Sequence, residues 1–488
     1  MNRIIATLTL LIAAVFAARS TAQTVAIDTL IIKAHTHFLA HDLLAGRATG
    51  SLGNRLAALY IESQCRALGL TPIDEQYDLP VPLEEAEVLP STQLALKSSR
   101  GSVQFLYPLD FTPNVGTQHT LRGFAGPTVF VGTEGDVLKG RADHLEILEK
   151  IAVTVGPFRG AAADTLAARG ALGMVHLIGT AEGFDLYLRS RGSTRLYHRD
   201  PEVPSSFLPG LPSVLGGPRL ARALLAGATV GEDQDVAPQP LPWTLWYEPA
   251  FKRAPVDEAN VGCVLRGTDA DARDTAIVLT AHYDHLGISL PDARGDSIYN
   301  GFSDNAVGVA MLLAIADAVG RRADTRLRHS LVFLFLTGEE RGLLGADYYA
   351  ANPAWPLDRT VAAINLDAGA PPAPPVSWRI AGVDSTGLGS LAFAIARRQG
   401  WKVTTSPARP NSDYYPFHRE GVPAAFVIPG PGPYEGLSAD SSKALRARWD
   451  HYHQPSDHWE EDFPFSGLAR YAQFALLLIR EIDGTGLR

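Results

Sequence analysis

The sequence predicts an α/β fold: a mainly parallel mixed sheet flanked by helices, with a small β-rich domain inserted before it. Three observations support this prediction. Strand-like and helical segments alternate from about residue 260 to the C-terminal end. The strand-like segments are almost continuously apolar, which is typical of parallel strands covered on both faces. Residues 126–230 instead show short β-like runs separated by glycine-rich turns.

The first part of the chain is predicted to be helical. Between residues 29 and 70 apolar positions recur at helical spacing, as in LGNRLAALYIESQCRALGL. A mixed, proline-rich stretch follows. In the inserted region we expect PTVFVG, KIAVTV and GMVHLIG to be strands and DTLAARGALG to be a helix between two of them.

The second half of the chain carries the alternating pattern. The expected strands are TAIVLTAH, SLVFLFLTG, VAAINLD and AAFVIPG. The expected helices are NAVGVAMLLAIADAVG, LLGADYYAA, GLGSLAFAIARRQG and GLARYAQFALLLIREI, with Asp304 at the N-cap of the first. Sheets of this kind bind ligands beyond the carboxyl ends of their strands. A functional site is therefore expected at that edge.

Length and charge limit the possible functions. A chain of 488 residues is too long for one compact core and predicts two domains or three. We divide it into a leader (1–22), the N-terminal part of the main domain (23–122), an insert (123–249) and the α/β part of the main domain (250–488). The formal net charge of -9 provides no basic surface, so nucleic acid is not expected as a partner.

The first residues have the features of an export signal. Arg3 precedes an apolar stretch that is too short to span a membrane, and small residues follow it. We expect cleavage after Ala22 and a secreted or periplasmic protein. No later segment is expected to be long and apolar enough to span a membrane, so no span is expected in the mature chain.

Cysteine chemistry is left open by the sequence. The chain has two cysteines, Cys65 and Cys263. An exported protein can pair them, and two buried free thiols fit the sequence equally well. Neither lies in a CxxC motif or a Cys/His cluster, so cysteine is not expected to bind a metal.

Polar residues gather where the expected strands end. Taken singly, each has an ordinary explanation as a helix cap or a solvated side chain. Together they place many charges beside an apolar core, which is unfavourable unless a cation compensates them. They are His282, Asp284 and His285 after the first strand, Asp304 before a helix, Glu339 and Glu340, Asp367, and the late group His451, His453, Asp457 and His458.

The residue types point to zinc. Zn²⁺ accepts both imidazole nitrogen and carboxylate oxygen, whereas Mg²⁺ or Ca²⁺ would favour carboxylates alone. Two histidines and three carboxylates exceed the needs of one zinc with an open position. They suit two metals about 3.5–4 Å apart that share a carboxylate.

At these residues the chain resembles a known family, the secreted di-zinc aminopeptidases of metallopeptidase family twenty-eight. The resemblance runs over about residues 258–482 through AHYDHLG, GFSDNAVG, GEERGLLGA, INLDA, SDYYPF and YHQPSD, in the order of the family. FLAHDLLAGRATGSLGNRLAALYI resembles the leading helices of the family. KIAVTVG and ARGALGMVHLIG resemble the protease-associated domain that many members carry.

The resemblance implies a zinc-peptidase-like α/β/α sandwich and a role for each matching residue. Glu339 would be the general base that takes a proton from a water. Asp284 would orient the imidazole of His282, and Tyr452 would hydrogen-bond the tetrahedral intermediate. Two Zn²⁺ ions per chain would be held by His282 and Asp367 on one side, by Glu340 and His453 on the other, and by Asp304 as the bridge.

The spacing of these residues is chemically reasonable. His282 and Asp284, two apart on an extended chain, point the same way, so one can bind metal while the other supports it. Glu339 and Glu340 point in different directions, so one can bind metal while the other faces the water. The implied activity is removal of the N-terminal residue from peptides with a free N-terminus.

The chain departs from the family pattern in three places. Ser303 stands where an aspartate is usual before the bridging residue, and Tyr414 stands where a histidine is common. The segment LGISLPDARGDSIYNG lengthens the chain between His282 and Asp304. The change at Tyr414 bears on the substrate pocket and on side-chain specificity.

Alternative functions were weighed against this one. TLIIKAHTH can be a strand that ends on His35 and His37, as in barrel amidohydrolases, but it also fits a helix. GPGPYEG matches a nucleotide-binding pattern formally, yet its prolines remove the backbone donors that phosphate needs. A non-catalytic peptide-binding protein should have lost metal ligands, and a glutaminyl cyclase should not keep the full two-metal set. A carboxypeptidase needs a cation for the substrate carboxylate, for which Arg409 is a candidate.

Overall fold

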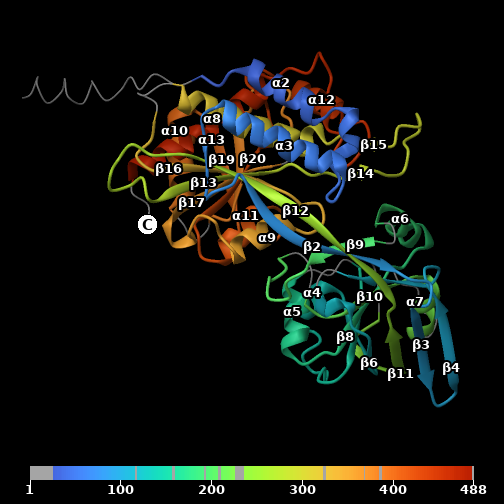
Figure 1. The fold of residues 1–488 in the computed structure, drawn as a ribbon. Coiled ribbons are helices and arrows are strands. Elements are labelled where there is room, and N and C mark those ends of the chain that lie inside the picture. Colours follow the sequence, from blue (N-terminus) through green and yellow to red (C-terminus); the bar gives the residue numbers. More distant parts are fainter. Residues whose placement is uncertain are drawn as a thin grey trace, which may run out of the picture.

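The computed structural model describes residues 26–115, 118–156, 160–191, 194–206, 210–225, 236–321, 326–367, 369–383 and 387–485. The expected leader, residues 1–22, lies outside these ranges. The described residues form two lobes, each built on its own sheet (Figure 1). The larger lobe contains both ends of the described chain, and the smaller lobe contains the middle of the sequence.

The sheet of the larger lobe is mixed, with a parallel centre. Its strands lie in the order β19-β18-β20-β17-β13-β16-β12-β2-β9, with β1 beside β12. The four neighbours β20, β17, β13 and β16 run parallel, and β12 and β2 are antiparallel additions. The strands are β1 (Thr71–Pro72), β2 (Asp78–Val88), β9 (Thr194–His198), β12 (Phe251–Leu265), β13 (Ala276–His282), β16 (Ser330–Leu336), β17 (Thr360–Leu366), β18 (Ser377–Ala381), β19 (Lys402–Ser406) and β20 (Ala424–Pro429). The predicted mixed α/β sheet is confirmed, but only its centre and the edge pair β18–β19 are parallel, while its other strand pairs are antiparallel.

Helices cover both faces of this sheet, as Figure 1 shows. One face carries α2 (Thr29–Leu39), α3 (Leu52–Ala67), α8 (Val307–Gly320), α10 (Leu388–Gln399), α12 (Ala439–Trp449) and α13 (Ser466–Thr485). The other carries α9 (Leu344–Ala351) and α11 (Tyr414–Arg419). Every residue of β13 and β16 is buried between these layers, which explains their unbroken apolar sequence.

One helix of the described residues is long and apolar enough to cross a membrane. It runs over Phe302–Gly320, and nearly all of it is buried inside the fold. The expectation that no later segment reaches this length and apolarity was therefore wrong. The helix is apolar because α2, α13 and the sheet contact it from several sides.

The smaller lobe is built on an eight-stranded sheet in the order β4-β3-β11-β6-β7-β8-β10-β5. Its elements are β3 (Gln93–Ser98), β4 (Gly101–Leu106), β5 (Phe111–Asn114), β6 (Phe124–Gly132), α4 (Glu134–Leu138), β7 (Ile151–Val155), α5 (Gly160–Ala168), β8 (Gly173–Leu177), α6 (Ala181–Arg191), β10 (Ser213–Gly216), α7 (Pro218–Leu224) and β11 (Gln239–Glu248). Its sheet begins at Gln93, thirty residues before the expected boundary at 123. Exposed residues interrupt the apolar pattern of β4, so this early strand is weakly marked in the sequence.

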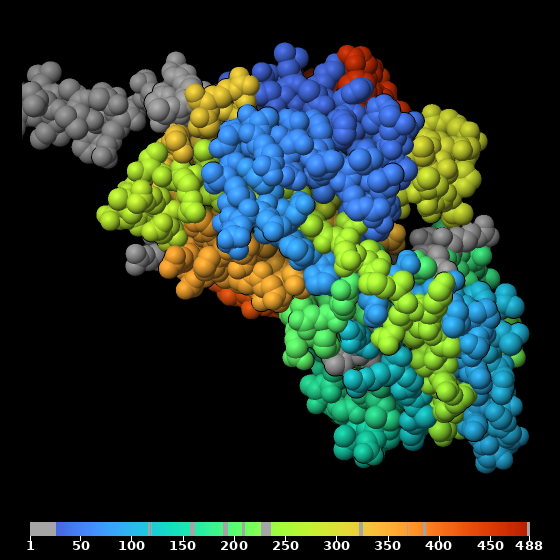
Figure 2. Space-filling view, viewed as in Figure 1, coloured from blue at the N-terminus to red at the C-terminus, as the bar shows by residue number. Residues whose placement is uncertain are grey.

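The two lobes share strands. β2 and β12 pair over their length and run from one lobe into the other, through the narrow waist visible in Figure 2. In the sequence, β9 lies between β8 and β10 of the smaller lobe, but it pairs with β2 in the large sheet. Just beyond it, the backbone N–H of Ser206 donates to the carboxylate of Asp347 on α9 at 2.8 Å. The smaller lobe is thus anchored to the helix that follows the paired glutamates.

A disulfide joins Cys65 to Cys263. It links α3 to β12, and the chain between the two cysteines contains the whole smaller lobe. Of the two states that the sequence left open, the structure has the paired one. Among exported proteins such pairing is common.

Candidate metal centre

Three neighbouring parallel strands bring polar side chains to one edge of the sheet. His282 is the last residue of β13, and Asp367 follows β17 at once. Glu339 and Glu340 follow β16 after a short turn. Because these strands are parallel, their carboxyl ends meet at the same edge. The fold therefore brings together residues that lie up to eighty-five positions apart.

Asp304 lies in the turn Phe302–Ala306 that leads into α8. The sequence placed it at the N-cap of this helix, and that prediction was wrong. The N-cap residue is Ala306, while the side chain of Asn305 accepts a hydrogen bond from the backbone N–H of Gly308 at 3.0 Å. The backbone of Asp304 is extended, with φ -134° and ψ 87°, and its carboxylate faces the histidines of the sheet edge.

The carboxylate of Asp304 lies between two imidazoles. Its Oδ1 is 3.2 Å from Nε2 of His282, and its Oδ2 is 3.0 Å from Nε2 of His453. Nε2 of His282 also lies 3.2 Å from Oδ1 of Asp367, and Nε2 of His453 lies 3.3 Å from Oε1 of Glu340. The two oxygens of Asp304 thus contact different histidines, Oδ1 the ring of His282 and Oδ2 the ring of His453.

The side chains fall into two groups, each with at least three possible metal ligands. Within each group the ligand atoms lie within 4.8 Å of one another. One group holds His282, Glu339 and Asp367, and the other holds His285, Asp304, Glu340 and His453. The adjacent glutamates go to different groups, as their opposite directions along the chain suggested.

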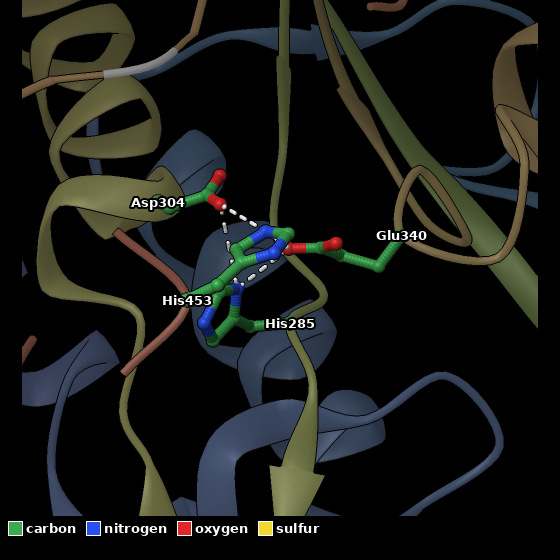
Figure 3. A group of neighbouring side chains, drawn as sticks. All are labelled: His285, Asp304, Glu340 and His453. Atoms are coloured by element: carbon green, nitrogen blue, oxygen red, sulfur yellow. Dashed lines mark ion pairs between the residues drawn. The ribbon is translucent and has the colours of Figure 1, made fainter. Parts of the chain in front are cut away.

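His285 belongs to the second group, although the sequence analysis gave it no role. Its ring is fully buried, with Nδ1 at 2.7 Å from Oε1 of Glu340 and 3.8 Å from Oδ2 of Asp304 (Figure 3). Residues three apart on an extended strand point to opposite faces. The chain leaves the strand after His282 and turns, which brings the second histidine back to the cluster. The one available signal was its position in AHYDH.

Four buried atoms of this group meet no hydrogen-bond geometry among the described residues: both ring nitrogens of His285, Oε1 of Glu340 and Nε2 of His453. Three of them lie in close ion-pair contacts within the cluster, and Nε2 of His285 has no such contact with the described residues. Buried polar atoms without good hydrogen bonds are unfavourable unless another species satisfies them. Imidazole nitrogen and carboxylate oxygen are ligand types that Zn²⁺ accepts. The donor set therefore fits zinc.

The electrostatics of the cluster favour positive charge. Burial would lower the pKa of His453, but Asp304 and Glu340 outweigh it and raise that pKa to about 10. Burial would also lower the pKa of His282. The negative charges of Asp367 and Glu339 outweigh burial, so the pKa of His282 is raised well above its usual value. Such shifts are those of a carboxylate-rich site that attracts cations.

The two glutamates differ in their pKa. Burial, together with the charges of Asp367, Glu340 and Asp413, raises the pKa of Glu339 well above its usual value, against the opposing effect of His282. For Glu340, burial is outweighed by its contacts with His285 and His453, and its pKa is lowered. The adjacent carboxylates thus sit in distinct environments.

Asp284 supports the site differently from the expected way. Its carboxylate lies 3.7 Å from Nδ1 of His282, and it is the backbone oxygen of Asp284 that contacts this nitrogen, at 3.2 Å. The carboxylate accepts hydrogen bonds from the backbone N–H groups of Glu339 at 3.1 Å and Glu340 at 3.4 Å. The hydroxyl of Thr49 donates to it at 2.9 Å. It therefore holds the turn that carries the glutamates.

Two further supporting residues come from distant parts of the chain. The buried side chain of Arg47 donates from Nε to the oxygen of Tyr283 at 2.9 Å and from Nη2 to the oxygen of Gly301 at 3.1 Å. Both oxygens of Asp457 accept from the backbone N–H of Ser303 at 3.0 Å. Arg47 fixes the chain on either side of the cluster, and Asp457 ties the late loop to the Asp304 turn. The sequence analysis assigned neither role.

The SDYYPF segment contributes more than its tyrosine. The Ser412 hydroxyl donates to Oδ2 of Asp367 and accepts from the Asn365 side chain at 2.6 Å. Asp413 is buried, and burial raises its pKa well above the usual value. Tyr414 itself is a core residue: its hydroxyl donates to the backbone oxygen of Arg409 at 2.9 Å. The departure at Tyr414 thus affects core packing in this region.

Several residues singled out by the sequence lie away from the cluster. His451 contacts the backbone oxygen of Arg448, and His458 that of Trp459. TLIIKAHTH lies in helix α2 rather than in a strand, so the barrel alternative is excluded. In it, His35 pairs with the hydroxyl of Tyr60 at 2.9 Å, while the ring of His37 lies against Trp459.

Tyr452 lies at the rim of the site. Its ring stacks on that of His453, with centroids 3.8 Å apart, and 56% of its surface is exposed. A cavity of about 320 Å³ opens beside it. Ser303, Gly369 and Tyr452 line this cavity, and each is one or two residues from a member of the cluster. Arg409 is not among the lining residues.

Comparisons with known proteins agree with this architecture. Residues 260–479 match the model of Peptidase family M28. An aminopeptidase from Aneurinibacillus sp. strain AM-1 shares the fold over 94% of both chains, with 19% identity and a TM-score of 0.55. A zinc aminopeptidase from Bacillus subtilis aligns over 93% of this chain and 95% of its own, with 19% identity and a TM-score of 0.48.

A curated relative matches a shorter segment. It is a protein of Leptosphaeria maculans named as a probable zinc metalloprotease, 33% identical over 107 residues. The match covers 22% of this chain and 23% of the relative. The chain thus spans about a quarter of the length of that relative.

Proposed function

We propose, because residues 260–479 match the model of Peptidase family M28, that the chain is a member of this family and a zinc aminopeptidase, which removes the N-terminal residue of peptides through a di-zinc centre. The observation that carries the proposal is the pair of ligand groups, with Glu339 in one and Glu340 in the other, and with Asp304 of the second group also in contact with His282 of the first. The name of the solved structure with a TM-score of 0.55, an aminopeptidase, supports it.

In this proposal five side chains would hold two zinc ions. His282 and Asp367 would hold one ion, and Glu340 and His453 would hold the other. Asp304 would serve both, consistent with its position between two imidazoles. When bound, zinc would lower the pKa of a water toward about 7 and polarise the scissile carbonyl.

Glu339 acts as the general base. It accepts a proton from the attacking water and returns it to the nitrogen of the leaving amine, a role worth about 10²–10⁴-fold in rate. Asp284 holds the backbone of this residue through the 3.1 Å hydrogen bond from its N–H. Tyr452, at the rim beside His453, donates from its hydroxyl to the oxygen of the tetrahedral intermediate.

The carboxylate-rich cluster also suits a free α-amine. A protonated or neutral amine finds acceptor oxygens there, whereas a blocked N-terminus brings an extra carbonyl and lacks the charge. Cleavage is therefore restricted to the first peptide bond. All five ligand positions and Glu339 are present in this chain, which disfavours a non-catalytic binding protein.

We propose further that residues 1–22 are a cleaved export signal and that the protein works in the periplasm or outside the cell. The disulfide between Cys65 and Cys263 supports an oxidising compartment. The smaller lobe is proposed to be a protease-associated domain that bounds access to the site.

The test is metal analysis of the purified protein alongside hydrolysis of a panel of aminoacyl anilides and their N-acetylated controls. About two zinc ions per chain, with cleavage of free-amine substrates alone, is the expected result. Metal-free protein that is still active, or equal cleavage of acetylated substrates, would overturn the proposal.

A further inference from the structure

The cavity beside the metal centre carries two arginines. Arg379 and Arg446 line it, together with one acidic residue, Asp450. Within the described part of the chain neither arginine forms an ion pair. Most of the remaining wall is aromatic or apolar, so the cavity combines an unneutralised positive charge with surfaces that fit a hydrocarbon chain.

Arg446 is oriented by a tyrosine and retains a free donor. It lies on α12 and donates from Nε to the hydroxyl of Tyr434 at 3.2 Å, with its guanidinium 5.2 Å from the centre of that ring. Its Nη2 is buried and has no hydrogen-bond partner among the described residues. A buried charged donor without an acceptor is unfavourable. Nη2 is therefore available to an acceptor that the protein does not supply.

Arg379 reaches the cavity from the sheet. It lies on β18 and pairs across the ladder with Ile428 of β20, which also lines the cavity. The backbone of a strand in a sheet positions a side chain more rigidly than a loop does. Two arginines, one from a helix and one from a strand, thus line the same space.

The cavity is continuous with the proposed catalytic centre along the chain. Ser303 precedes Asp304, and Tyr452 precedes His453, so two lining residues are direct neighbours of proposed ligands. These two neighbours place the cavity beside the proposed ligands, where it can take another part of the same substrate. Its volume of about 320 Å³ is at the small end of ligand pockets, which suits one amino-acid residue.

We propose that this cavity is a subsite for a substrate carboxylate, which binds Arg446 and Arg379. The inference rests on the proposed aminopeptidase function and narrows its substrates to peptides with a carboxylate close to the scissile bond. Arginine is well suited to carboxylates because its planar guanidinium donates two parallel hydrogen bonds. The carboxylate has two possible sources, an acidic N-terminal side chain or the C-terminus of a dipeptide.

The experiment compares kcat/KM for two matched substrate pairs. The first pair is the p-nitroanilides of glutamate and glutamine, and the second is the dipeptide Leu-Ala and its C-terminal amide. Since a hydrogen bond to a charged group contributes about 1.5–3 kcal/mol, one pair should differ by about 10- to 100-fold. A preference for the glutamate anilide would show that the subsite binds the side-chain carboxylate. A preference for the free dipeptide would show that it binds the C-terminal carboxylate. No preference in either pair would overturn the inference.

Variants connect the preference to the arginine. Arg446→Met should bring the preferred pair to nearly equal kcat/KM, and Arg446→Lys should retain part of the difference. Lys443→Met is the matched control, since it removes a positive charge from an exposed position of the same helix, and it should leave the ratio unchanged. A wild-type ratio in Arg446→Met would contradict the assignment.

Failure of the inference and failure of the proposed function are separable. Cleavage of leucine substrates without any carboxylate preference would leave the aminopeptidase function intact and refute the subsite. If no substrate is cleaved, calorimetry measures the subsite directly, with glutamate against glutamine and with the dipeptide Leu-Ala against its C-terminal amide. Tighter binding of the carboxylate member of either pair that Arg446→Met abolishes would support the subsite, and equal binding within both pairs would refute it.

Discussion

The carboxylate of Asp284 accepts a hydrogen bond from the backbone N–H of Glu339 at 3.1 Å. This contact joins the end of β13 to the turn after β16, fifty-five residues later. The same carboxylate also accepts from the N–H of Glu340 at 3.4 Å and from Thr49 at 2.9 Å. One buried side chain thus fixes the backbone from which both glutamates project.

Asp284→Asn should reduce both zinc affinity and kcat. The amide keeps one acceptor but places N–H donors opposite backbone N–H groups, so the glutamate turn shifts. Loss of such a supporting residue typically costs about 10- to 100-fold in metal affinity or activity. Thr49→Val is the matched control, because it removes one donor to Asp284 and leaves the backbone contacts in place; its effect should be severalfold smaller. Zinc dissociation constants and kcat values of the two variants test whether Asp284→Asn has the larger effect. Wild-type values of both quantities in Asp284→Asn would refute the prediction.

The paired glutamates should give two different mutant phenotypes. Glu339→Gln should keep its zinc and lose about 10²–10⁴-fold in kcat, because the water loses its proton acceptor. Glu340→Gln should lose zinc affinity as well, because a proposed ligand is removed. Metal content and turnover measured on the same preparations separate the two. Equal zinc loss in both variants would mean that the roles are not divided in this way.

His285 is expected to contribute to zinc binding. Its Nδ1 lies 2.7 Å from Oε1 of Glu340 inside the second ligand group, so it either orients that carboxylate or binds metal itself. His285→Phe should weaken binding of one zinc by about 10- to 100-fold. His451→Phe, on the loop of His453 but directed away from the cluster, should bind zinc as the wild type does. Competition with a chelating dye measures the zinc affinity of each variant. Equal zinc affinities of His285→Phe and His451→Phe would exclude a role for His285 in zinc binding.

The smaller lobe should lose stability in mild acid. His176 on β8 is buried, with its Nδ1 3.0 Å from the hydroxyl of Thr154, and burial lowers its pKa from 6.5 to about 4. Between these two values the unfolded chain binds a proton that the folded chain does not, so stability falls as pH drops from 6.5 toward 4. The full effect corresponds to about 3 kcal/mol.

Urea unfolding at a series of pH values tests this effect. His176→Asn should flatten the pH dependence, whereas the exposed His144→Asn should keep the wild-type slope. If His176→Asn shows the same slope as the wild type, the acid sensitivity arises elsewhere. His35, whose pKa burial also lowers to about 4, lies on α2 of the larger lobe, so varying it tests whether the acid sensitivity arises outside the smaller lobe.

The central strands of the larger lobe could be predicted from the sequence because strands buried on both faces are apolar at nearly every position. β13 and β16 are buried at every residue, and their apolar runs mark both the strands and the edge where His282 and Glu340 lie. The pairing of β2 with β12 was not predicted, since much of β12 is exposed and its apolar residues follow no regular period. The start of the smaller sheet at Gln93 was also missed, because β4, the strand paired with β3, is mostly exposed and has no clear apolar pattern.

The parts of the site that were missed depend on tertiary geometry. His285 joins the cluster because the chain turns after His282, and neither its spacing nor its type marks this turn. Asp304 was expected to cap α8, as aspartate often does at such positions, but its neighbour Asn305 accepts the helix N–H instead. Arg47 acts on the backbone of residues more than two hundred positions away, a relationship that a single sequence does not contain.

The most direct test of the account is an anomalous difference map at the zinc absorption edge, from crystals of the purified protein. We predict two peaks about 3.5–4 Å apart on either side of Asp304, one beside His282 and Asp367 and the other beside Glu340 and His453. A single peak, or two peaks that do not share Asp304, would contradict the di-zinc centre.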